Sequence, residues 1–140
     1  MTSRPRSPLR LGPWTALPAL AIALVWAYEG GWCKALGQCG NQTDIVASVP
    51  GLPAGLVRTC LVLLGLAELA VGGWVLSGRR PWLAAQVQTT AVVAFNTGGL
   101  VLASSSIQEP GRLVVTDLAL IALIWLVARD VGACEASRGD

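Results

Sequence analysis

Four ionisable side chains lie near the ends of long uncharged segments, where they could form one polar site. Arg58 and Asp117 each stand about one turn inside such a segment, on the same side of the predicted fold. Leaving either charge unpaired in an apolar medium would be costly, and a salt bridge would pair both. Arg58 is therefore the natural partner of Asp117. Glu29 and Lys34 fall at the same level. We therefore predict a polar cluster of Glu29, Lys34, Arg58 and Asp117.

A single carboxyl group, Glu68, interrupts the apolar run from Thr59 to Ser77 near its middle. An ionised carboxylate at the centre of a bilayer costs ~2.5–3.5 kcal/mol, so Glu68 must be protonated, paired or turned toward a polar cavity. Three residues share its stripe of the predicted helix: Arg58, Gly65 and Gly72. Glycines on such a stripe let a neighbouring helix approach closely. A structural hydrogen bond and a functional proton or ligand site are both compatible with Glu68.

The third apolar segment carries a polar face at helical spacing, made by Gln86, Thr90, Asn96 and Thr97. Two interpretations remain open. The side chains could make hydrogen bonds between helices, worth only ~0.6 kcal/mol each on average. Alternatively, they could line a polar pocket or a path for protons or a small solute.

Cys33 and Cys39 are six residues apart, a separation that permits a disulfide. A structural disulfide, two free thiols and a redox-active pair are all compatible with this spacing. The chain has no histidine and a single methionine, Met1, which removes the usual ligands of haem, zinc and copper. We therefore expect no haem or metal. Phosphate-binding loops and nucleophile motifs are not found either, so no catalytic residues are assigned and a non-enzymatic role is favoured.

The elements that must position these residues are membrane helices, because 54% of the residues are hydrophobic and only 13% are charged. A soluble core of 140 residues could not bury so much apolar surface. The continuous apolar runs also exclude strands that alternate between apolar and polar residues. We predict an all-α polytopic membrane protein, a four-helix transmembrane bundle with helices at about 13–35, 55–77, 81–104 and 113–129. Residues 1–10 form a disordered basic arm and residues 131–140 a cytoplasmic tail.

Basic residues predict the orientation, since arginine and lysine gather on the cytoplasmic side. Seven lie on one predicted side: Arg4, Arg6, Arg10, Arg79, Arg80, Arg129 and Arg138. Lys34, Arg58 and Arg112 lie on the other. Both termini are thus expected in the cytoplasm of a cell inner or plasma membrane, with Trp26 among the aromatic residues of the outer boundary. A signal peptide is the competing interpretation of the first segment, but no small-x-small cleavage site follows its apolar run.

Three short segments resemble the DoxX-like family of small four-helix membrane proteins. LVWAYEGGWCKALG, residues 24–37, is similar to the family's opening, with Trp26, Glu29, Gly30 and Lys34 at the matching positions. LGLAELAVG, residues 64–72, looks like its second helix, and TDLALIAL, residues 116–123, is similar to the start of its last helix.

The resemblance implies an accessory or subunit-type protein linked to quinone and redox metabolism, with quinone as the one cofactor suggested. Its partners are the lipid bilayer and either an oxidoreductase subunit or further copies of the chain; no nucleic acid is expected. Two alternatives stand beside it. One is a small oligomeric transporter that uses the polar helix faces, and the other is a thiol redox protein that uses Cys33 and Cys39.

Overall fold

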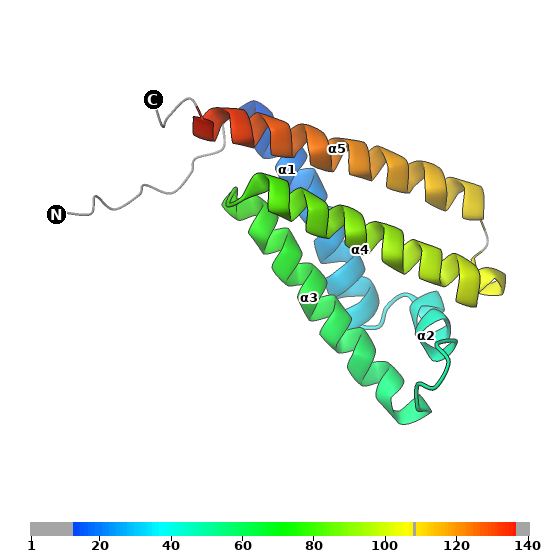
Figure 1. Cartoon of the computed structure of the whole chain (residues 1–140). Coiled ribbons are helices and arrows are strands. Elements are labelled where there is room, and N and C mark those ends of the chain that lie inside the picture. The colour runs from blue at the N-terminus through cyan, green and yellow to red at the C-terminus, as the bar shows by residue number, and fades with distance from the viewer. Residues whose placement is uncertain (1–12, 108, 137–140) are drawn as a thin grey trace.

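The computed structural model describes residues 13–107 and 109–136, and all of their regular elements are helices (Figure 1). The first long helix is α1 (Pro13–Trp26), which continues without a break into a π-helix, η1 (Ala27–Ala35). A short α2 (Gly40–Ala47) and a single turn, η2 (Ala54–Leu56), lead into α3 (Val57–Ser77). Then follow α4 (Pro81–Leu102), a turn η3 (Ser104–Ser106) and α5 (Pro110–Ala136). The arm predicted for residues 1–10 lies outside the described residues.

Three of these helical stretches are long and apolar enough to cross a membrane: Ala16–Ala35, Ala54–Ser77 and Pro110–Cys134. Large aliphatic side chains cover their outer surfaces, among them Leu17, Leu63 and Val115. Such a surface is stable against hydrocarbon and not against water. The chain is therefore an all-helical, polytopic membrane protein, as the composition predicted. α4 is uncharged and 22 residues long, but with its polar side chains it is not among these three stretches.

The long helices pack as a set in which α1 and η1 hold a central place. α1 packs against both α3 and α5, and α4 lies along α5. Figure 1 shows α3 and α4 joined by a tight turn at one end and diverging toward the other, where α2 lies between them. The turn contains two left-handed residues, Gly78 and Arg80, and the Trp74 indole donates a hydrogen bond to the carbonyl oxygen of Arg79 at 2.8 Å.

The helices differ from the predicted ranges chiefly in two places. The loop predicted between residues 37 and 55 contains α2, which includes part of the segment DIVASV that we suggested as a short interfacial piece. α5 continues past residue 129 to Ala136, so the first part of the predicted tail is helical. Gly132 lies against the Trp82 indole there, which gives this last part of α5 a packing partner. Trp26 is buried and does not belong to the outer aromatic belt.

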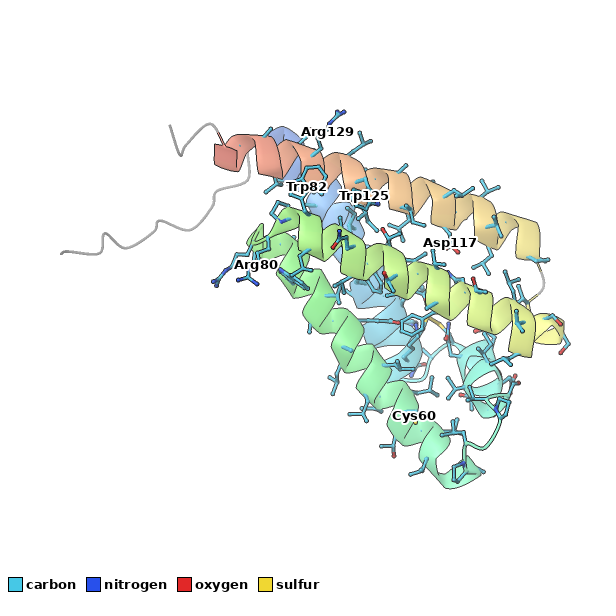
Figure 2. All side chains as sticks on the ribbon, viewed as in Figure 1. Cys60, Arg80, Trp82, Asp117, Trp125 and Arg129 are labelled. Carbon is cyan, nitrogen blue, oxygen red and sulfur yellow. A yellow bond between two sulfur atoms is a disulfide. The ribbon has the colours of Figure 1, made fainter. Side chains whose placement is uncertain are left out.

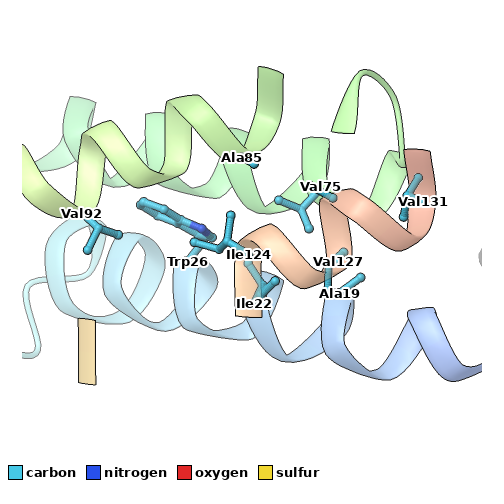
Figure 3. Close-up of a cluster of buried hydrophobic side chains, with 10 residues drawn as sticks. Ala19, Ile22, Trp26, Val75, Ala85, Val92, Ile124, Val127 and Val131 are labelled. Atoms are coloured by element: carbon cyan, nitrogen blue, oxygen red, sulfur yellow. The ribbon is translucent and has the colours of Figure 1, made fainter. Parts of the chain in front are cut away.

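The hydrophobic core lies where α1, α3, α4 and α5 meet (Figure 3). Inside a bilayer no hydrophobic effect drives helices together, so their association depends on close packing and hydrogen bonds. Small side chains at the contacts allow that packing. The core residues are Ala19, Ile22, Trp26, Val75, Ala85, Val92, Ile124, Val127, Ala128 and Val131.

η1 and α3 approach each other very closely at Gly30 and Gly65. A Cβ atom added to Gly30 would lie 2.6 Å from the carbonyl oxygen of Gly65 and 2.7 Å from the Cβ of Glu68. A Cβ on Gly65 would overlap the carbonyl oxygen of Gly30. Two turns earlier along the first helix, Gly72 of α3 faces the backbone of Ala23. The glycine stripe predicted on α3 is thus its packing face, and only hydrogen atoms fit between the two backbones.

Replacing Gly65 by alanine should therefore force η1 and α3 apart. We expect Gly65→Ala to reduce stability by about 1–3 kcal/mol, the usual cost of overpacking a filled interface. Gly73→Ala is the matched control, because a Cβ at Gly73 meets no atom within 4 Å and the change is the same, eight residues along α3. Thermal unfolding in detergent measures both. Equal midpoints for the two variants would contradict the predicted contact.

Candidate functional site

A buried lysine between two carboxylates is the most polar arrangement inside the bundle. The Nζ atom of Lys34 lies 3.0 Å from each carboxylate oxygen of Glu68 and 3.6 Å from Oε2 of Glu29. Lys34 is 8% exposed and Glu68 is 3% exposed, whereas the Glu29 side chain is 42% exposed. We call these three residues the Lys34 cluster. The cluster is shielded from the surroundings of the protein at Glu68 and accessible from them at Glu29.

The π-helix explains why Glu29 and Lys34 meet. Backbone hydrogen bonds in a π-helix join residues five apart, so side chains with this separation lie on the same side of the helix. The amide of Leu36, for example, donates to the carbonyl of Gly31 at 2.9 Å. Glu29 and Lys34 are five residues apart and fall within η1. In a regular α-helix this separation would turn their side chains about 140° away from each other.

Gly30 then brings this part of η1 onto Glu68. Gly30, Cys33 and Lys34 are the buried residues of η1, and Gly65 and Glu68 are buried on α3. Because Gly30 has no side chain, Glu68 lies directly against the η1 backbone and within reach of Lys34. A buried charge needs a partner and hydrogen bonds, and Lys34 and Glu68 supply both to each other. Glu68, predicted as a separate intramembrane carboxyl, is the inner member of the cluster.

Arg58 lies beside this cluster and binds backbone oxygens. Its guanidinium donates to the carbonyl oxygens of Lys34 at 3.1 Å and of Ala35 at 2.6 Å. These carbonyls end η1, where helical hydrogen bonding stops and where partial negative charge collects. Arg58 therefore caps η1 and holds the Lys34 backbone in place.

The predicted salt bridge between Arg58 and Asp117 is wrong. Asp117 instead accepts a hydrogen bond from the Asn96 side chain at 2.7 Å, between α5 and α4. The reason is the order of the helices: α1 packs between α3, which carries Arg58, and α5, which carries Asp117. Of the predicted cluster, Glu29 and Lys34 meet, and Glu68 joins them. Arg58 lies beside these three residues, and Asp117 lies apart from them.

Much of the polar face predicted on α4 points away from the other helices. Gln86, Thr90 and Thr97 are exposed, and Asn96 is half-buried at its bond to Asp117. The buried polar residue of α4 is Gln88, which the sequence analysis missed. The Trp26 indole donates to Oε1 of Gln88 at 2.9 Å, and the Gln88 amide donates to the carbonyl of Ala84 at 3.0 Å. Gln88 is four residues from Ala84 and four from Val92, so the three share one face of the helix, and this spacing was the available signal.

A disulfide joins Cys33 at the end of η1 to Cys39 just before α2. Gln42 of α2 then donates a hydrogen bond to Oε2 of Glu29 at 3.5 Å. The disulfide and this bond hold α2 beside the open side of the Lys34 cluster. Among residues 13–107 and 109–136, no three His, Cys, Asp or Glu side chains gather as metal ligands.

Removing the charge of Lys34 should destabilise the bundle, because it leaves the Glu68 carboxylate buried without a partner. For Lys34→Met we expect a loss of about 3–5 kcal/mol, the usual cost of breaking a buried ion pair from one side. The double variant Lys34→Met, Glu68→Leu should recover most of that loss. Arg112→Gln serves as control, since it breaks an exposed pair with Glu109 that contributes little. Unfolding midpoints test this, and a double variant as unstable as Lys34→Met would refute it.

Comparison with known proteins agrees with the geometry of the chain. A model of the DoxX-like family matches residues 23–125, a range that contains the Lys34 cluster, Arg58, α3, α4 and most of α5. The comparison found no match among curated proteins or solved structures. The family match covers well over half of the sequence, and it coincides with the three segments whose residues resemble this family. This polytopic membrane protein therefore belongs to the DoxX-like family.

Proposed function

We propose that this chain is an accessory membrane protein of quinone-linked redox metabolism, and that the Lys34 cluster binds the quinone head group. The observation that carries this proposal is the position of Lys34, held between a buried carboxylate and a half-exposed one. A quinone carbonyl oxygen accepts hydrogen bonds, and the lysine ammonium has three donors. Glu29 and Glu68 accept protons and can donate them when protonated.

The surroundings of the open side support a ligand that comes from the bilayer. Tyr28 and Trp32 are exposed on η1, in the turns that carry Glu29 and Lys34. Aromatic side chains of this kind favour the boundary between lipid and water, where a quinone ring could stack on them. α2 covers the cluster from the aqueous side through Gln42.

An accessory role fits the way the polar groups of the bundle are used. Arg58 caps η1, Asp117 binds Asn96, and Gln88 binds Trp26. These contacts lock helices together and leave Glu29 as the cluster member that a ligand can reach. The two alternative functions have less support. Gln86, Thr90 and Thr97 face outward and line no path within one chain. Cys33 is a buried residue of η1, which keeps its sulfur from reaching a substrate.

We also propose that α4 is the fourth membrane span and that the disulfide end faces away from the cytoplasm. α4 lies along α5, which supports a common depth. The described ends of α1 and α5 lie near the turn between α3 and α4 (Figure 1). Figure 2 shows Arg80 and Arg129 at this same end of the molecule, with Trp82 and Trp125 beside them. Basic residues favour the cytoplasmic side and tryptophans the interface.

This orientation predicts that the bond between Cys33 and Cys39 persists in the cell, because disulfides survive in oxidising compartments and are reduced in the cytosol. Trypsin cleaves after Arg10, Lys34 and Arg58, so the two cysteines fall in separate peptides, 11–34 and 35–58. If thiols are alkylated in intact cells before lysis, mass spectrometry should find these peptides linked until a reductant is added. Separate, alkylated peptides before reduction would place this end in the cytosol.

The quinone proposal predicts that lipophilic quinone stays with the purified protein in native-like lipid. Glu29→Gln should lower the bound quinone several-fold, because Glu29 is the open side of the cluster and is exposed enough to change without unfolding the bundle. Asp117→Asn is the matched control, since it removes a carboxylate bonded to Asn96, outside the cluster. Extraction and chromatography quantify the quinone per protein. Wild-type protein that retains none, or an equal loss in both variants, would contradict the proposal.

A further inference from the structure

Four residues of α4 form an outward stripe that the bundle does not use. Gln86, Thr90, Val93 and Thr97 are spaced by four, three and four residues, and all four are exposed. At 100° per residue they fall on one side of the helix. The buried residues Ala84, Gln88 and Val92 fall on the opposite side. The stripe is therefore presented to whatever surrounds the chain.

With α4 as the fourth span proposed above, its contacts with α5 put this stripe at the depth of hydrocarbon. Thr89 accepts a hydrogen bond from the Trp125 indole at 3.1 Å, and Asn96 binds Asp117 at 2.7 Å. Both partners belong to α5, whose stretch Pro110–Cys134 is long and apolar enough to span a bilayer. Along α4, Thr90 and Val93 lie between the positions of these two hydrogen bonds. Gln86 and Thr97 lie just outside them. An amide or hydroxyl group at this depth needs a hydrogen-bond partner, which lipid tails do not offer.

We propose that a second copy of this chain covers the stripe, with the two α4 helices packed side by side in parallel. Two copies inserted with the same orientation are related by an axis along the membrane normal, so each residue on the axis meets its own counterpart. The stripe suits such self-pairing, because an amide and a hydroxyl each both donate and accept hydrogen bonds. The stripe contains no charge that would repel its copy.

The spacing of the stripe supports the same geometry. Alternating separations of four and three residues form the seam of two helices that cross at a shallow angle, as in a left-handed coiled coil. Val93 supplies an apolar side chain between the polar residues Thr90 and Thr97 of the stripe. Leu83, three residues before Gln86, is exposed on the same side of α4. A polar residue in such a seam fixes the register and the number of chains. Gln86, Thr90 and Thr97 thus specify a parallel dimer.

The first test is the molecular mass of the protein in lipid nanodiscs or detergent, by light scattering corrected for lipid or detergent. Wild-type protein should be a dimer. The triple variant Gln86→Leu, Thr90→Val, Thr97→Val keeps side-chain size and removes the donors and acceptors, so dimerisation should weaken roughly tenfold or more. These residues are exposed and the new ones are apolar, so the fold of one chain is preserved. Thr116→Val, an exposed threonine of α5, is the control and should leave the dimer unchanged.

The second test is oxidative cross-linking in a Cys60→Ser, Cys134→Ser background. A Thr90→Cys variant should form a disulfide between two chains, because position 90 meets its own copy at the axis. Leu118→Cys, exposed on α5, should not. A monomeric wild-type protein, a triple variant that dimerises as tightly as the wild type, or cross-linking at position 118 in place of position 90 would each overturn the proposal. None of these measurements depends on quinone binding.

Discussion

The contact between Gly30 and Gly65 is the constraint on which the rest of this structure depends. Two helix backbones can touch only where neither carries a side chain, and here they touch beside Glu68. That approach buries Glu68 and brings Lys34 within 3.0 Å of it. Arg58 then reaches the carbonyls at the end of η1. A larger residue at either glycine would separate the charges from each other and leave them facing lipid.

The Lys34 cluster also depends on the π-helix, because π-helical geometry changes which side chains of η1 point in the same direction. A wider helical turn places Glu29 with Lys34, and it carries Cys33 inward to the disulfide with Cys39. π-helical turns are frequent at functional sites. In this chain the π-helix supplies a lysine with two carboxylates that it could not contact together in a regular α-helix.

α4 combines two kinds of polar residue with different tasks. Gln88 faces inward and binds Trp26, which links α4 to α1 at the core. Asn96 and Thr89 bind α5 from the flank. The residues on the outer side have no such use within one chain. The polar residues of α4 are thus divided between those that hold the bundle together and those that present a surface to a neighbour.

The sequence by itself determined the class of this protein and the positions of its long helices. Uncharged runs of about 20 residues require helices in lipid, because only helical hydrogen bonding satisfies the backbone there. The glycine stripe around Glu68 was also readable from spacing alone. These features are local, so the order of residues along the chain is enough to recognise them.

Only the tertiary structure decided which polar groups meet. Whether Arg58 reaches Asp117 depends on which helices are neighbours, and α1 lies between them. The pairing of Glu29 with Lys34 depends on a π-helix, which an α-helical period does not reveal. The inward position of Gln88 and the outward position of Gln86 depend on how α4 is rotated against α5. Helical periodicity groups residues on faces, but packing against neighbours selects the face that is buried.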